Sequence, residues 1–592
     1  MAEEELRAII QRCQILDEAD FKGEDFNLFQ VAGQKCLEEG YISEVLEVVQ
    51  NEKNVVIVKS MGWNLIGPLI RSILKHKQDE IERKQCLTML ERLIQVCSPK
   101  ELLLGFLEQI EQASQENVSQ TILILLDPLH EVLLKLGNKK AYSVGLSLST
   151  ILDQLSLLPV PYTKHQLEED EHGLCRCCTA LPCFVRPFVD EVVQHLEDSS
   201  NRGCRELKEE LLAFCLKSIK YPLLVAELDH VPEETAENPF RQFAADILDI
   251  LQDIRELFPK VFSQHGCRNE SWDDEELTKI DHEQHADSLA CLSYLIFVQN
   301  CFGLNCFPTI FDPSYILQCN MVHIKVLLNK KEEPVLSKGL ALLENCLLRL
   351  ENDSLHTERL DFKVFVATSE DLVKVATMCP FEPLRKKSLK VLQLYIDKFE
   401  EEGKYILFRC LLQSSNHSGM EAYIIQNIKN QIDLALQKPE GSSFFLGNTL
   451  IKLLDNVLLL PEGASTDLLQ NSDRIMAALN LLRYLFIKDK EYENRTSLWK
   501  ELYKIQQTFL KPLYTALFLS KQHYKAEIKR RRENKGESST SATSTSITVG
   551  GKKMSKLTSQ MELQVLHSAL VTFDLIESIL ARVEELTDTF SY

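Results

Sequence analysis

Apolar residues recur every three or four positions along most of the chain, which is the spacing of amphipathic helices. The sequence has no runs of alternating apolar and polar residues between hairpin signals, so a sheet-based fold finds little support. We therefore predict an all-α protein. The predicted helices of the N-terminal half lie at 3–19, 24–39, 43–50, 61–74, 80–97, 100–111, 118–136, 138–157, 174–197, 204–220, 239–257 and 283–301.

Two segments of the C-terminal half, 335–350 and 383–399, look like copies of one helix. They align with Gly339 opposite Ser388, and a third segment places Ala478 in the same position. In each copy the small residue is followed by the pattern Leu-x-Leu/Val-Leu. The first two copies are 49 residues apart and the third follows 90 residues later, which indicates a period near 45–49 with one copy skipped.

That period lies close to the length of HEAT and armadillo repeats. Helix pairs of this size cannot bury their apolar faces alone and become stable by stacking on one another. We therefore predict an irregular HEAT/armadillo-like helical-repeat solenoid with a groove along its inner helices. In the C-terminal half the inner helices are predicted near 384–398, 420–436 and 473–487.

The predicted inner helix at 420–436 has an unusual polar face. Ser418 and Glu421 have the spacing of a capping box, which predicts where this helix starts. Apolar residues at helical spacing predict its buried side, while amides replace the Lys and Glu expected on a merely solvated side. The buried side comprises Ala422, Ile425, Ile428, Ile432 and Leu436, and the amide side comprises Gln426, Asn427, Asn430 and Gln431. Because amides both donate and accept hydrogen bonds, this face predicts contact with another protein.

We predict two parts of the chain, with N-terminal HEAT-like repeats over 1–310 and C-terminal HEAT-like repeats over 311–592. A stretch rich in Ser, Thr, Gly and Lys at about 529–556 cannot bury a core, so we predict a disordered loop there. The basic run Lys529–Arg532 at its start has the composition of a nuclear signal, but a solvated helix end explains it better.

Composition narrows the classes of function. Hydrophobic residues make up 45% of the 592 positions, enough to bury a core along most of the chain. The net charge of -21 argues against binding of nucleic acid, which needs a basic surface. The first residues do not resemble a secretory signal, and charges interrupt the apolar stretch at 122–136 before the roughly 20 residues that a bilayer requires. We expect a cytoplasmic protein with no membrane partner.

The best candidate for a chemical site is the cluster HGLCRCCTALPC at 172–183. Zinc takes four thiolate or imidazole ligands, usually as two separated pairs. Cys175 and Cys178 form one C-x2-C pair to which Cys183 or Cys204 could add, but no second pair stands at a typical distance. We therefore interpret these thiols as packed side chains, with a zinc site and a redox dithiol as the weaker alternatives.

No other motif indicates catalysis. The sequence contains no P-loop, no dinucleotide fingerprint after a strand, no G-x-S-x-G elbow and no H-E-x-x-H. We therefore predict no enzymatic activity, no cofactor and no bound metal.

Several stretches resemble the glomulin family of vertebrates. The similarity extends from the N-terminus to about Leu586, and the long segments of the C-terminal half are specific. The stretches include MGWNLIGPLI (61–70), LRKKSLKVLQLYI (384–396), LFRCLLQSSNHSGMEAYIIQNIKNQIDLAL (407–436) and VLHSALVTFDLIESILARVEEL (565–586).

This resemblance implies an all-helical protein of HEAT-like repeats. Its C-terminal region would bind the RING domain of the RING-box subunit of cullin-RING ubiquitin ligases, and through that subunit the cullins. By covering the surface that receives the ubiquitin-charged E2, it would compete with E2 enzymes and inhibit ubiquitin transfer. The alternative is a general helical-repeat adaptor or scaffold that binds several partners in signalling.

We expect the RING contacts to lie on two neighbouring inner helices. A RING's E2-binding surface mixes an apolar patch with exposed backbone groups and some positive charge, and amide side chains suit such a surface. The alternative to a partner contact, for an Asn on an inner helix, is a hydrogen bond to the neighbouring repeat. The first set of predicted contacts is Gln426, Asn427 and Asn430 with Tyr423 as an aromatic anchor, and the second set is Arg474, Asn480 and Arg483.

Overall fold

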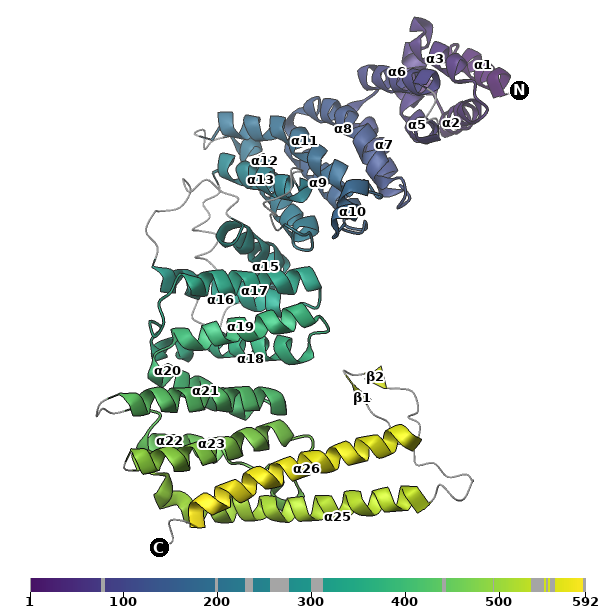
Figure 1. The fold of residues 1–592 in the computed structure, drawn as a ribbon. Helices are drawn as coiled ribbons and strands as arrows, with labels where there is room; N and C mark the ends of the chain where they lie inside the picture. The colour runs from purple at the N-terminus through teal and green to yellow at the C-terminus, as the bar shows by residue number, and fades with distance from the viewer. Residues whose placement is uncertain are drawn as a thin grey trace. The chain divides into compact units, whose positions relative to one another are not determined.

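The chain is built almost entirely from helices, and it divides into two compact units, Met1–Phe311 and Asp312–Tyr592 (Figure 1). The predicted all-α helical-repeat class is confirmed. The computed structural model describes residues 2–75, 80–196, 201–228, 238–255, 276–299, 312–438, 443–492, 494–533, 548–549, 552–553 and 559–588.

The first unit is a succession of packed helices with an aromatic core. Most predicted helices are present, but the one predicted at 61–74 begins later, because α4 ends at Met61 and a 3-10 turn leads into α5. The large side chains buried here include Phe29, Phe106, Phe188, Phe214, Phe240 and Phe243. The helices are α1 Ala2–Cys13, α2 Gly23–Glu38, α3 Ile42–Gln50, α4 Val55–Met61, α5 Ile66–Lys75, α6 Glu80–Val96, α7 Pro99–Glu111, α8 Val118–Leu134, α9 Lys140–Leu155, α10 Lys164–Glu169, α11 Leu174–Gln194, α12 Arg202–Ser218, α13 Pro239–Asp253 and α15 Glu276–Phe297.

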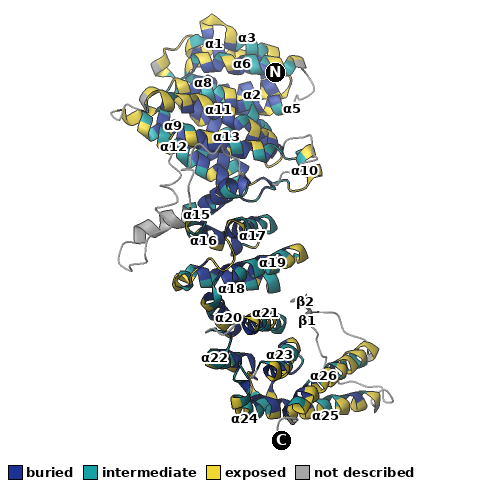
Figure 2. Cartoon of the chain, turned by 60° about the vertical axis from the view of Figure 1, so that its left-hand side comes forward, coloured by how far each residue is buried: buried dark blue, intermediate teal, exposed yellow. Residues whose placement is uncertain are grey.

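The second unit stacks helix pairs in two layers. The first helices of successive pairs, α16, α18, α20 and α22, pack on one another, and in the second layer α17 packs on α19 and α21 on α23. Buried residues concentrate between the layers, as the dark blue inner sides in Figure 2 show. The helices are α16 Pro313–Leu328, α17 Glu333–Leu348, α18 Lys363–Met378, α19 Glu382–Lys398, α20 Glu401–Ser414, α21 Ser418–Gln437, α22 Gly447–Val457, α23 Ser472–Glu491, α24 Leu502–Ile505, α25 Lys511–Glu533 and α26 Ser559–Asp588.

The repeated small residue lies where the two helices of a pair approach each other closely. A Cβ atom at Gly339 of α17 would stand 2.9 Å from the Cβ of Leu327 in α16. At the equivalent position of α19, the Ser388 hydroxyl donates a hydrogen bond to the Leu372 carbonyl of α18 (2.8 Å). Ala478 of α23 is also buried. In its first two copies, the sequence pattern therefore marks a close contact between the two helices of a pair.

Main-chain hydrogen bonds join two loops of the second unit. The segment after α17, residues 351–357, which we call the strap, runs parallel to the end of α19 through a bridge between Leu355 and Phe399. The Leu355 N–H donates to the Lys398 carbonyl (2.9 Å), and the Glu400 N–H donates to the Leu355 carbonyl (3.0 Å). The buried Lys398 ammonium donates to the Leu350 carbonyl (2.9 Å) and to Asn352 Oδ1 (2.8 Å).

The predicted loop at 529–556 is partly wrong. Helix α25 continues to Glu533, because Arg531 pairs with Glu562 of α26 (2.7 Å) and with Glu527 of its own helix (2.8 Å). Thr548–Val549 and Lys552–Lys553 form a short antiparallel hairpin, β1–β2. The predicted disorder otherwise falls on residues outside those that the structure describes.

Helix α26 is long and apolar enough over Gln560–Thr587 to cross a membrane, by length and composition alone. From the sequence we expect only apolar stretches that are too short for this. One side of it is buried in the second unit through Phe573, Ile576, Leu580 and Val583. That side packs against α23 and α25, so the same pattern also suits a helix that closes a stack.

Candidate protein-binding surface

A groove of about 420 Å³ lies between α21 and α23, which are neighbours in the second layer (Figure 1). Its floor is apolar, with Ile425 and Leu481 both buried. Small residues on the facing helices leave the space open. The lining residues are Gly419, Ala422, Ile425, Gln426, Lys429, Asp473, Met476, Ala477, Asn480 and Leu481.

The N-terminal end of α21 differs from the predicted capping box. His417 caps this helix, with its Nδ1 accepting the Met420 N–H (3.2 Å). The Ser418 hydroxyl instead accepts the backbone N–H of Arg474 in α23 (3.0 Å). The Ser418 side chain, which the local sequence predicts to cap α21, therefore forms a hydrogen bond to another helix instead.

A buried ion pair joins α21 to α23 below the groove. Arg474 Nη1 lies 3.3 Å from Glu421 Oε2, and both side chains are almost completely buried. Arg474 also donates through Nη2 to the Asn456 carbonyl at the end of α22 (2.9 Å). Burial raises the pKa of Glu421, while the Arg474 charge opposes that rise. The pair thus fixes three consecutive helices at one point.

The structure separates the predicted amide face into exposed and buried members. Gln426 and Asn430 are exposed, and Gln426 Nε2 donates to Asn430 Oδ1 (3.1 Å). Asn427 is only 5% exposed and donates to the Tyr423 carbonyl one turn earlier (3.1 Å). The Tyr423 hydroxyl donates to Gln393 Oε1 of α19 (2.6 Å). Of the predicted contacts on this helix, Gln426 and Asn430 are therefore the amides that a partner can reach.

The second predicted set divides in the same way. Asn480 and Arg483 are exposed on α23, whereas Arg474 is held in the buried ion pair. Of the seven predicted contacts, Gln426 and Asn480 line the groove from opposite sides. Asn427 and Arg474 do not offer their side chains to a partner in this structure.

A second link between the helices escaped the sequence analysis. The Lys429 ammonium lies 4.9 Å from the ring centroid of Tyr484, and the Tyr484 hydroxyl donates to Asp433 Oδ1 (2.5 Å). Burial raises the pKa of the Tyr484 hydroxyl well above its usual value. The signal that could have located the groove is the pair of small residues, Ala422 and Ala477, on the facing helices.

Comparison with known proteins identifies the lineage of this chain. A family model described as "Uncharacterised protein family, YAP/Alf4/glomulin" matches residues 1–569. The chain belongs to this family. Glomulin of Mus musculus and glomulin of Homo sapiens are each 54% identical to it over 588 residues, which cover 99% of this chain and 98% of theirs.

Solved structures add little to this assignment. The structure described as "A conserved phosphorylation switch controls the interaction between cadherin and beta-catenin in vitro and in vivo" shares 14% identity and covers 98% of this chain and 96% of its own. Its TM-score of 0.19 is too low to support an argument.

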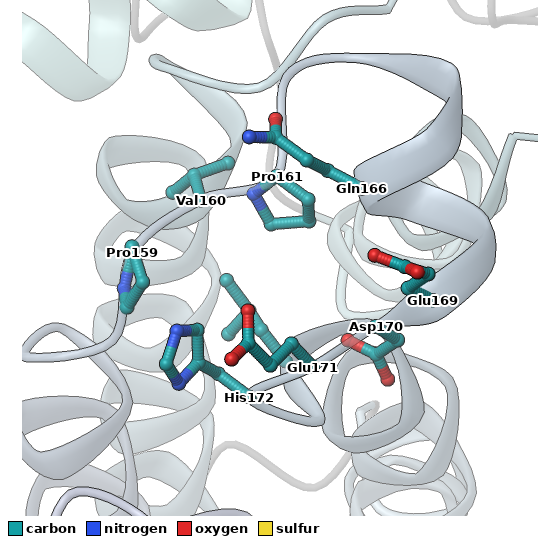
Figure 3. Close-up of a pocket in the computed structure, with 9 residues that line it drawn as sticks. Pro159, Val160, Pro161, Gln166, Glu169, Asp170, Glu171 and His172 are labelled. Carbon is teal, nitrogen blue, oxygen red and sulfur yellow. The ribbon is translucent and has the colours of Figure 1, made fainter.

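In this member of the YAP/Alf4/glomulin family, a smaller pocket of about 110 Å³ lies beside the cysteine cluster in the first unit. Figure 3 shows it between Pro159 and Pro161 on one side and the acidic residues around α10 on the other. Asp170 accepts the N–H groups of Cys175 (3.0 Å) and Arg176 (3.1 Å), so its carboxylate serves to cap α11.

The cysteines of that cluster lie mostly in the core. Cys175, Cys177 and Cys178 are buried, whereas Cys183 is exposed. Burial raises the pKa of Cys175 and Cys177 to about 12 and that of Cys178 well above its usual value, so thiolates are disfavoured. Within the described ranges no three His, Cys, Asp or Glu side chains are grouped to hold a metal ion.

Proposed function

We propose that this chain binds the RING domain of the RING-box subunit of cullin-RING ubiquitin ligases and masks its E2-binding surface. The observation that carries the proposal is the α21–α23 groove, an open apolar floor with an amide on each side, in a chain of the YAP/Alf4/glomulin family. Identity of 54% to two glomulins supports it, because the family resemblance implies this partner.

The chemistry of the groove suits the expected partner surface. The half-buried lining residues Ala422, Met476 and Ala477 can contact an apolar patch. The Gln426 and Asn480 amides can both donate to and accept from exposed backbone groups. The exposed Asp473 carboxylate at the rim can meet positive charge on the partner. The proposed contacts therefore combine one apolar and two polar modes of recognition.

The proposed mechanism is steric competition in the cytoplasm. A ligase whose E2 site is covered cannot position the E2 thioester for attack, so no catalytic residue, metal or cofactor is needed. Inhibition should then depend on the ratio of this chain to E2 rather than on a slow chemical step.

The test is a titration of the full chain into a cullin-RING reaction at several concentrations of ubiquitin-charged E2. The expected result is loss of ubiquitin chain formation, with the half-inhibitory concentration rising in proportion to E2. Undiminished chain synthesis at saturating protein would overturn the proposal. Inhibition that is independent of E2 concentration would overturn the masking mechanism.

A further inference from the structure

The outward face of α24 and α25 is exposed and unusual in composition. Residues 502–533 are helical throughout, with a π-helical turn at Gln506–Leu510, so they span about 48 Å at 1.5 Å per residue. One side packs into the second unit. The buried side chains are Ile505, Phe509, Leu510, Leu513, Ala516, Leu517 and Ile528.

Large apolar side chains project from the opposite side. Tyr503 is 75% exposed, Tyr514 and Phe518 are each 57% exposed, and Leu519 is 55% exposed. Tyr514 and Phe518 are four residues apart and therefore adjacent on the helix surface. Single exposed apolar residues are ordinary, but a group of aromatic rings on one rigid helix marks an interaction surface.

Basic side chains continue the same line. Residues 511, 514, 518, 525, 529 and 532 are spaced by three, four or seven, which places them along one stripe of the helix. Lys511, Lys525 and Lys529 on this stripe are exposed. We call Tyr514, Phe518 and these three lysines the outer stripe.

Acidic residues are nearly missing from this helix, although the whole chain carries a net charge of -21. Residues 502–533 contain eight Lys and Arg but only two acids, Glu527 and Glu533, and Glu527 is half-buried and pairs with Arg530 (3.1 Å) and Arg531 (2.8 Å). The helix dipole favours cations in the last turn, which accounts for Arg530 to Arg532. It does not account for Lys511 and Lys525.

We infer that the outer stripe binds an acidic segment of a partner protein whose apolar residues lie at one end. The aromatic rings occupy the first half of the stripe and most of its charge the second half, so the partner's apolar residues would face Tyr514 and Phe518. Its carboxylates would then face Lys525 and Lys529. Tyr, Phe and basic side chains together are typical of the centres and rims of protein interfaces.

An anionic membrane is a poorer match to this arrangement. A helix that lies on a membrane presents one continuous apolar face with Lys and Arg on the other side. Here the apolar and basic side chains share one stripe, with Lys511 before the aromatic rings and Lys525 and Lys529 after them. The inference is also independent of the α21–α23 groove, since none of its residues lines that groove.

The test measures fluorescence anisotropy of a labelled peptide with Leu and Phe in its first half and Glu and Asp in its second half. With the full chain, we expect binding that weakens as salt rises and that falls at least tenfold in Y514A/F518A and in K525E/K529E. Matched controls in the first unit are Tyr142→Ala, which removes another exposed Tyr, and K84E/K100E, which reverses two exposed lysines. Both controls should bind as the unmodified chain does.

Three results would overturn the inference. The first is no binding of this peptide by the unmodified chain, or equal binding by all four variants. The second is equal binding of a peptide in which Lys replaces Glu and Asp. The third is binding to phosphatidylserine vesicles but not to the peptide, with the same variants affected, because the face would then be a membrane surface.

Discussion

Arg474 and Glu421 are charged residues in a place where charge is costly. Each is held by the other at 3.3 Å, and the Asn456 carbonyl takes one further Arg474 hydrogen bond. Removing one partner of such a pair leaves an uncompensated buried charge, whereas replacing both with apolar side chains is often tolerated. We therefore expect the change in stability on substituting one of these residues to depend strongly on whether the other is substituted as well.

We predict that Arg474→Met lowers the free energy of unfolding by about 3 kcal/mol, because the Glu421 carboxylate is left buried without a cation. The double variant E421L/R474M should recover most of that loss. Urea denaturation of the three proteins measures both effects. Equal losses in the single and double variants would show that the ion pair itself is not what Arg474 contributes.

The same site predicts a pH effect. Burial raises the pKa of Glu421, so the folded state binds this proton more tightly than the unfolded state does. In Arg474→Met, where the opposing cation is gone, stability should rise as pH is lowered from 7 toward the unfolded-state pKa of about 4.3. The measurement is the urea midpoint of unfolding over this pH range. The control is E421L/R474M, which lacks this carboxyl and should not show the rise.

Single residues also show where local sequence reasoning stops. Ser418 has the right spacing for a cap, but its hydroxyl accepts a hydrogen bond from a backbone N–H of α23, far along the chain. His417 caps the helix instead. Asn427 lies beside the apolar stripe, and a helix packed from two sides buries a wider arc than that stripe. Both outcomes depend on which helices become neighbours, which a single stretch of sequence does not contain.

At the scale of elements, α21 and α23 act together because each supplies one amide to the groove. We predict that Q426A/N480A weakens binding to the RING-box protein by more than about 1 kcal/mol, roughly fivefold, if these are interface contacts. Ala477→Trp should weaken it as well, because the larger side chain would fill the groove from its wall. Calorimetry on the full-length variants measures both.

The matched control for this pair is Q50A/Q112A, which removes two exposed amides from the first unit. Its affinity for the RING-box protein should equal that of the unmodified chain. Unchanged affinity in a folded Q426A/N480A would remove the groove from the binding surface.

Contact within a helix pair gives an element-scale prediction about stability. A Cβ at Gly339 would stand 2.9 Å from Leu327 Cβ, so Gly339→Ala should cost about 1–3 kcal/mol through overpacking. Gly23→Ala is the control, since no atom lies within 4 Å of its added Cβ. It should be neutral or slightly stabilising, because Ala restricts the unfolded chain. Thermal unfolding of the two variants compares them, and equal midpoints would contradict the close approach.

Elements were the level at which the sequence was most informative. The periodic spacing of apolar residues located α17, α19, α21 and α23 to within a few residues, because each packs through one persistent stripe. The end of α25 was missed, because composition around Lys529 indicates a loop whereas Arg531 is fixed by Glu562 on another helix. The groove itself was not predicted, because Ala477 leaves an open space only where it faces Ala422 on the neighbouring helix.

At the scale of the whole molecule, the net charge of -21 affects how partners arrive. We predict that the association rate with the RING-box protein falls as salt rises, because an acidic chain attracts a partially cationic surface over distances that salt screens. The dissociation rate should change much less. Stopped-flow measurements over a range of ionic strength provide both rates, and an association rate independent of salt would contradict electrostatic steering.

The strap has a mechanical consequence for the stacked helices of the second unit. Helices in a stack touch through side chains, which can slide and repack as a solenoid flexes. The hydrogen bonds of Leu355 with Lys398 and Glu400 connect backbone to backbone, so they break rather than stretch when the loops are pulled apart. We therefore expect the junction between the α17 and α19 pairs to resist bending. Bending of the second unit under load is then directed to junctions held by side chains, among them the one at the α21–α23 groove.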